Sequence, residues 1–64
     1  MKIDTVFLKA IIFRQGLIQW QICHKIGLSE NYFSKLMNKK VEPTEKLVGK
    51  IAHFLKVKPE DLLL

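Results

Sequence analysis

The sequence has little of what holds many small domains together or binds a prosthetic group. Its single cysteine, Cys23, excludes a disulfide within the chain, and no set of cysteines and histidines has the spacing of a structural zinc site. No apolar run approaches the ~18 residues of a membrane span. Asp4 and Thr5 precede the first apolar stretch, and no small-residue cleavage site follows, which is unlike a signal peptide. We therefore expect no metal, no cofactor, no membrane association and a cytoplasmic protein.

A catalytic constellation is also missing. Cys23 and His24 are neighbours, and on a helix their side chains point about 100° apart, so they cannot act as a nucleophile and base. His53 stands alone. Glu60 and Asp61 fit the first turn of a helix, where acidic side chains interact favourably with the helix macrodipole. We expect no enzyme and no small-molecule substrate.

The 64 residues predict one domain, 1–64, with a modest core, because so short a chain buries only ~60% of the surface that it exposes when unfolded. The formal net charge is +5. Most of the excess lies in residues 14–40, which suits a surface that faces phosphates, although a merely solubilising face is the alternative. Within that segment a single acidic residue, Glu30, stands against Arg14, Lys25, Lys35, Lys39 and Lys40.

Turn-forming residues divide the chain into five helical segments with no sustained strand alternation. Asp4, Ser29 and Thr44 are good N-caps for segments that continue to about residues 14, 37 and 55. A second segment runs from about 19 to 26, and a last turn follows residue 59. We expect Gly16 and Gly27 to end the first two helices in a left-handed conformation, Asn38 to end the third with positive φ, and Gly49 to face solvent. The predicted fold is all-α, with four to five short helices.

The second and third predicted helices are separated only by Gly27, Leu28 and Ser29. A turn of this length joins helices that cross at ~90–120°. With Phe33, Leu36 and Met37 assigned to the core, the outer face of the third helix carries mixed hydrogen-bonding side chains, which is what reading base edges in the major groove requires. A solvated helix face is the competing interpretation. The outer residues are Glu30, Asn31, Tyr32, Ser34 and Lys35.

The stretch GLIQWQICHKIGLSENYFSKLMNKK resembles the Xre/Cro family of phage and bacterial repressors, and LKVKPEDLL near the C-terminus continues the match, so the resemblance covers nearly the whole chain. It implies a lambda-repressor-like domain whose second and third helices form a helix-turn-helix that binds double-stranded DNA. It assigns base reading to Glu30, Asn31 and Lys35, with Tyr32 and Ser34 beside them. It assigns phosphate contacts to Gln19, Asn38, Lys39 and Lys40.

The sequence departs from the family pattern at several positions. Ile18 replaces a polar N-cap, Lys39 replaces the loop glycine, and Trp20 replaces an exposed polar residue. Ile12 and Met37 stand where many members place a buried Arg–Glu pair, and we expect them to form an apolar contact instead. Three interpretations of Trp20 remain open: packing over the first helix or the domain edge, an apolar patch with Ile18 for a protein partner, and a contact from the indole N–H to a phosphate.

Leu63 and Leu64 exceed what so small a core needs, and related domains often pair through this end. We therefore predict a homodimer that presents two recognition helices to half-sites one helical turn apart, ~34 Å. The predicted function is that of a transcription regulator, a compact repressor. The alternatives are an antitoxin or anti-repressor that binds a protein through Ile18 and Trp20 or the C-terminal leucines, and non-specific nucleic-acid binding.

Overall fold

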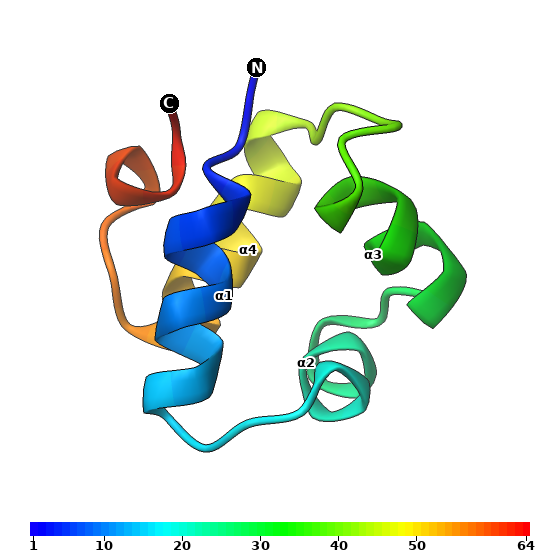
Figure 1. Cartoon of the computed structure of the whole chain (residues 1–64), viewed down its shortest axis with the longest axis vertical. Coiled ribbons are helices and arrows are strands. Elements are labelled where there is room, and N and C mark those ends of the chain that lie inside the picture. Colours follow the sequence, from blue (N-terminus) through cyan, green and yellow to red (C-terminus); the bar gives the residue numbers. More distant parts are fainter.

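The chain folds into four α-helices and one short 3₁₀ helix (Figure 1). The computed structural model describes residues 1–64. The prediction of an all-α fold is confirmed, since the only strand-like feature is an isolated β-bridge. None of the helices has the length and apolar character needed to cross a membrane. In chain order the elements are α1 (Thr5–Arg14), α2 (Gln19–Ile26), α3 (Glu30–Met37), α4 (Glu45–Leu55) and the 3₁₀ helix η1 (Pro59–Leu62).

Three helices begin at the predicted caps. The side-chain oxygens of Asp4, Ser29 and Thr44 accept hydrogen bonds from the backbone N–H three residues later, at 3.0, 3.1 and 3.2 Å. Each bond satisfies one of the amides that a helix start leaves unpaired. Ile18, before α2, has no such acceptor. Instead Oε1 of Gln21 accepts from the backbone N–H of Ile18 at 2.9 Å, which is half of a capping box.

All four α-helices end in the same way, with one residue in the left-handed conformation and a hydrogen bond from the next N–H back to the carbonyl five residues earlier, which is the Schellman motif. As predicted, Gly16 and Gly27 take this position after α1 and α2, with φ of 68° and 72°. The prediction for α3 is wrong: Asn38 has φ of −93°, and Lys39 turns the chain with φ of 61°. Lys56 does the same after α4, with φ of 60°.

A core of 12 buried hydrophobic residues draws on every helix and on the N-terminal segment. Helix α2 packs against both α3 and α4, while η1 packs against α1 and α4. Burial of each large aliphatic or aromatic side chain stabilises the fold by ~1.5–3 kcal/mol. The core residues on α3 therefore fix that helix against the rest of the domain. The core consists of Ile3, Leu8, Ile11, Ile22, Cys23, Phe33, Leu36, Val48, Ile51, Ala52, Leu55 and Leu62.

The two ends of the chain lie together at one end of the molecule (Figure 1). Ile3 and Leu63 form the antiparallel bridge, the N–H of Asp4 donates to the carbonyl of Leu62 at 2.7 Å, and the N–H of Leu64 donates to the carbonyl of Lys2 at 3.1 Å. Leu62 is fully buried. Leu63 is half-buried against the core, so part of its side chain already serves the monomer.

Candidate nucleic-acid interface

The turn between α2 and α3 has the three residues that the sequence predicts. Gly27 takes the left-handed conformation, and the N–H of Leu28 donates to the carbonyl of Cys23 at 2.9 Å. Leu28 is half-buried against the core, and Cys23, a small side chain 2% exposed, lies where the two helices approach. Together these contacts fix the direction in which α3 leaves α2.

One face of α3 is anchored in the core. Phe33 and Leu36 are buried at 1% and 0% exposure, as the spacing predicts. Met37 is only half-buried. Because the inner face is fixed in this way, the opposite face projects as a rigid row. That row has Glu30, Asn31, Ser34 and Lys35 exposed and Tyr32 half-buried.

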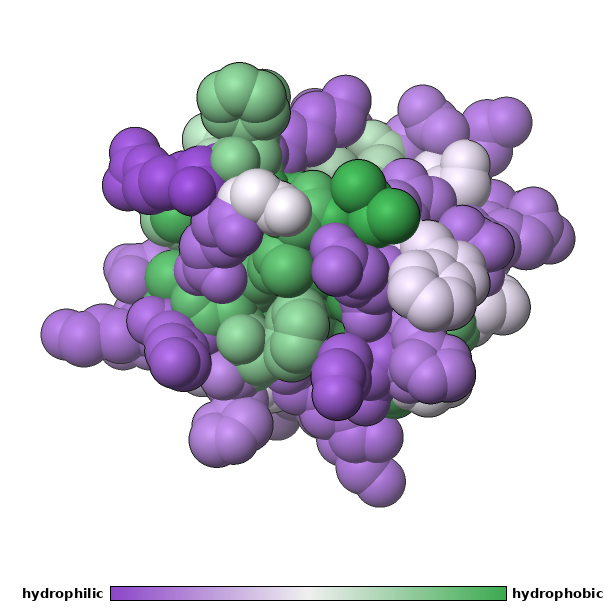
Figure 2. All heavy atoms as spheres, turned by 90° about the horizontal axis from the view of Figure 1, so that it is seen from below, coloured by the Kyte–Doolittle hydropathy of each residue, from purple (hydrophilic) through white to green (hydrophobic).

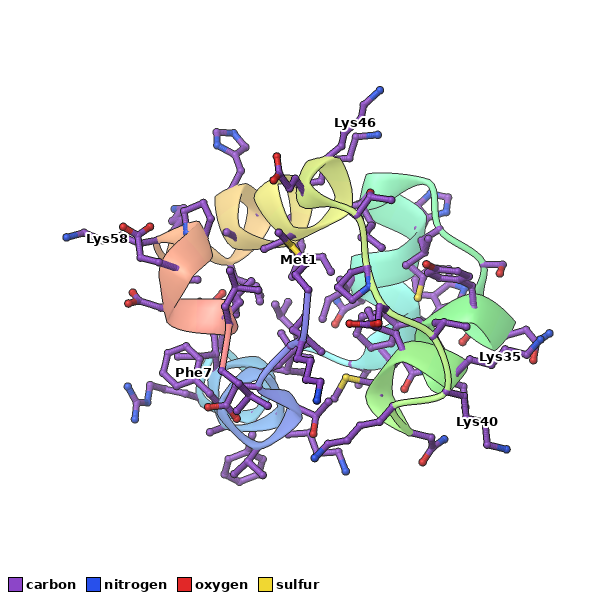
Figure 3. All side chains as sticks on the ribbon, turned by 90° about the horizontal axis from the view of Figure 1, so that it is seen from above. Met1, Phe7, Lys35, Lys40, Lys46 and Lys58 are labelled. Atoms are coloured by element: carbon purple, nitrogen blue, oxygen red, sulfur yellow. The ribbon has the colours of Figure 1, made fainter.

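The loop after α3 carries the residues expected at phosphates. Lys39 and Lys40 are exposed and occupy the last two positions of the Schellman motif, in which Lys40 N–H donates to the carbonyl of Lys35 at 2.9 Å. In Figure 3 the side chains of Lys35 and Lys40 leave the molecule on the same side. Asn38 is exposed too, but its Nδ2 donates to the carbonyl of Ser34 at 2.9 Å, which leaves Oδ1 without a partner within the chain. The same Nδ2 has a second hydrogen that is not used within the chain, so this orientation leaves a donor for a phosphate oxygen.

Gln19 is the first residue of α2 and its side chain is exposed. It lines a hollow of about 290 Å³ together with Phe33 and Met37, which places it beside α3. Ile12 and Met37 are both half-buried and line the same hollow. They share one apolar recess at the edge of the core, where we expected a contact.

The cysteine at the helix junction is not a reactive group. Burial raises the pKa of the Cys23 thiol, and the negative charge of Glu30 raises it further. Because the thiolate is the reactive form, a raised pKa keeps the sulfur neutral and inert. No group of three or more histidine, cysteine, aspartate or glutamate side chains is placed to hold a metal ion.

The family model HTH_3, described as helix-turn-helix, matches residues 8–62. The chain belongs to this family. It is an Xre-type, lambda-repressor-like family of DNA-binding domains with regulatory roles, and the matched segment contains α2, α3 and the loop that follows. No curated protein and no solved structure matches the chain significantly.

This helix-turn-helix chain exposes unusual apolar side chains near the start of α2. Ile18 and Trp20 are 60% and 54% exposed, and Phe13, at the end of α1, is 87% exposed. The indole of Trp20 stacks on the ring of His24, with centroids 5.4 Å apart, so it lies along its own helix rather than over α1. Figure 2 shows hydrophobic side chains gathered on the lower face, where α1 ends and the loop to α2 runs.

The positions of two further side chains were not predicted from the sequence. Gln15 donates from Nε2 to the carbonyl of Leu55 at 2.7 Å, joining the ends of α1 and α4 across 40 residues of chain. Lys25, which the charge count placed with the phosphate-facing segment, lines a hollow between α2 and α4 instead. No local sequence pattern predicts either location, because both depend on how the helices pack.

Proposed function

We propose that the protein is a sequence-specific regulator of transcription, of the compact repressor type, that inserts α3 into the major groove of double-stranded DNA. The observation that carries the proposal is the outer face of α3, where side chains of differing hydrogen-bonding character are exposed on a helix anchored by Phe33 and Leu36. A rigid helix with mixed donors and acceptors near its N-terminus suits base recognition.

The chemistry of each exposed residue matches a base edge. Asn31 suits the N6 and N7 atoms of adenine, Lys35 suits O6 and N7 of guanine, and Glu30 accepts from the amino group of cytosine. Tyr32 and Ser34 complete the surface that faces the groove. Contacts of this kind discriminate between bases, each by ~1–3 kcal/mol.

Phosphate contacts position the helix without reading sequence. We assign them to Gln19 at the start of α2 and to Asn38, Lys39 and Lys40 after α3. Lys39 and Lys40 also supply the charge that releases counterions from DNA, so the affinity is expected to fall as salt concentration rises.

The test is a selection from random duplex DNA, followed by titration of the selected sequence at several salt concentrations. We expect an enriched palindrome with half-sites about ten base pairs apart. Asn31→Ala should relax the preference at one base, whereas Lys40→Ala should weaken binding to all sequences alike and reduce the salt slope by about 1. If no sequence is enriched and Asn31→Ala leaves relative affinities unchanged, the binding is non-specific.

A protein-binding role is the second candidate, because Ile18 and Trp20 expose apolar surface that the core does not need. An antitoxin or anti-repressor uses such a surface for another protein. Neutralising Lys35 and Lys40 should abolish DNA binding and spare a protein complex. Replacing Ile18 and Trp20 with serine should have the opposite effect.

A further inference from the structure

A second basic surface lies between α2 and α4. A hollow of about 640 Å³ is lined by Lys25 and Ile26 from the end of α2 and by one face of α4. On α4 the lining positions recur every three or four residues, which places them in one row along the helix. They are Lys46, Gly49, Lys50, His53 and Phe54.

The lining is divided by chemistry. Lys25, Lys46 and Lys50 have exposed side chains that surround the hollow with positive charge, whereas Ile26 and Phe54 are half-buried and give it an apolar floor. The only ion pair in the chain joins the N-terminal amine to Glu42, so none of the three lysines is neutralised internally. Glu45 begins α4 one turn before Gly49, but it does not line the hollow.

Gly49 keeps the middle of this surface open. It stands in the interior of α4, where glycine destabilises a helix relative to alanine. Its φ is not positive, and a Cβ added to it would meet no other atom within 4 Å. The packing of the chain therefore does not require glycine here, and the missing side chain leaves the α4 backbone open at this position.

The hollow is separate from the proposed DNA surface. None of its lining residues belongs to α3 or to the loop that follows. In Figure 3 Lys46 projects from α4 in a different direction from Lys35 and Lys40. A molecule bound between α2 and α4 need not displace DNA from α3.

We propose that the surface between α2 and α4 docks an acidic, amphipathic segment of a partner protein. Carboxylates of the segment pair with Lys25, Lys46 and Lys50, and an apolar side chain packs on Ile26 and Phe54 beside Gly49. The apolar floor favours a peptide over a nucleic-acid backbone, because phosphates gain nothing from Ile26 and Phe54. The volume lies within the ~300–1,000 Å³ typical of ligand recesses.

The experiment uses the full chain, labelled with ¹⁵N, and a short acetylated peptide in which glutamates are interspersed with leucine and phenylalanine. Two control peptides replace the glutamates by glutamine or the apolar residues by serine. We expect the acidic amphipathic peptide to shift the amide signals of Lys25, Gly49 and Lys50, and both controls to bind several-fold more weakly. Equal binding by the serine control would overturn the proposal, since it would reduce the surface to a general attraction for polyanions.

Matched variants separate the groove from overall charge. Lys46→Gln with Lys50→Gln should lower the peptide affinity by about 5–10-fold. Lys9→Gln with Lys58→Gln makes the same change in net charge away from the hollow, and it should change the affinity by less than about twofold. Equal losses in the two double variants would contradict a defined site.

Gly49→Ala tests the open centre without endangering the fold, because alanine favours a helix. We expect it to raise the thermal midpoint and weaken the peptide severalfold. A short DNA duplex serves as the competing occupant. If the duplex shifts the same amides and Lys46→Gln with Lys50→Gln weakens DNA as much as peptide, the groove belongs to DNA and the proposal fails.

Discussion

Lys39 and Lys56 hold a backbone conformation that disfavours side chains with a Cβ. Each has φ near +60° and ends a helix in the position where Gly16 and Gly27 end α1 and α2. The left-handed conformation costs a residue other than glycine about 1–2 kcal/mol. A lysine recovers part of this by placing its charge at a helix C-terminus. At Lys39, the same charge also stands beside the proposed DNA surface.

Lys56→Gly should therefore stabilise the fold by about 1 kcal/mol, because glycine adopts this conformation without strain. For a domain of this size the thermal midpoint should rise by ~4–8 °C, measured by circular dichroism. Lys39→Gly should give a similar gain in stability but weaken DNA binding, whereas Lys56→Gly should leave DNA binding unchanged. A lower midpoint in both variants would show that lysine is not strained there.

Cys23 gives the fold a pH dependence of its own. Burial and the charge of Glu30 raise its pKa above the ordinary value of 9.0, so the folded chain retains the thiol proton to higher pH than the unfolded chain does. This contribution to stability is complete below pH 9.0 and is lost as pH rises through the folded pKa. Urea denaturation at increasing pH should show a steeper loss of stability for the natural chain than for Cys23→Ala. Parallel curves would contradict this origin of the pH dependence.

At the scale of the elements, the sequence predicts features that depend on local chemistry better than features that depend on packing. The starts of α1, α3 and α4 follow from Asp4, Ser29 and Thr44, because a cap acts within its own turn. The sequence predicts the end of α3 correctly, but it assigns the positive φ to Asn38, whereas Lys39 has it in the structure. Instead, Nδ2 of Asn38 donates to the carbonyl of Ser34 in α3. Residue type alone does not predict whether Asn38 makes this side-chain bond or adopts positive φ.

The outer face of α3 was predictable for a related reason. Once Phe33 and Leu36 are assigned to the core, the helical period leaves only one face for the remaining side chains. Contacts between elements distant in sequence were not predictable in this way. The pairing of Ile3 with Leu63, the bond from Gln15 to Leu55 and the row of lysines between α2 and α4 all depend on tertiary packing.

Gln15 links the end of α1 to the end of α4 through one side-chain hydrogen bond. Its amide donates to the carbonyl of Leu55 at the end of α4 in a partly buried setting. Gln15→Ala should destabilise the fold by about 1 kcal/mol, measured by urea denaturation. Gln21→Ala is the matched control, because it removes an exposed bond from Ile18 within one turn and should have a smaller effect. Equal losses would mean that the link between α1 and α4 contributes nothing beyond a local hydrogen bond.

At the scale of the whole molecule, two groups of lysines lie on two different surfaces. Lys35, Lys39 and Lys40 belong to α3 and its loop, whereas Lys46 and Lys50 belong to α4 and face the hollow beside α2. The net charge of +5 therefore does not describe a single DNA-binding face. Under the two proposals made above, DNA and an acidic partner would use different surfaces, and a partner would have access to a chain already bound to DNA.

The C-terminal end of the molecule is the predicted interface of a homodimer. Leu64 is 76% exposed and lines a hollow of about 400 Å³ with Met1, Ile3 and Val41, beside the loop that follows α3. We propose that a symmetric contact forms there, since it would bury the apolar side chains of this hollow. We expect sedimentation equilibrium to show a mass that rises with concentration.

Leu64→Asp should return the protein to a monomer and weaken binding to a palindrome far more than binding to a single half-site, because the second half-site no longer adds to the affinity. Ile18→Asp introduces the same charge at the other exposed apolar end, and it should leave the mass unchanged. If Ile18→Asp dissociates the dimer and Leu64→Asp does not, the subunits pair through the face that carries Phe13 and Trp20. That surface would then be occupied by a second copy of the chain, and the protein-binding alternative would lose the observation on which it rests.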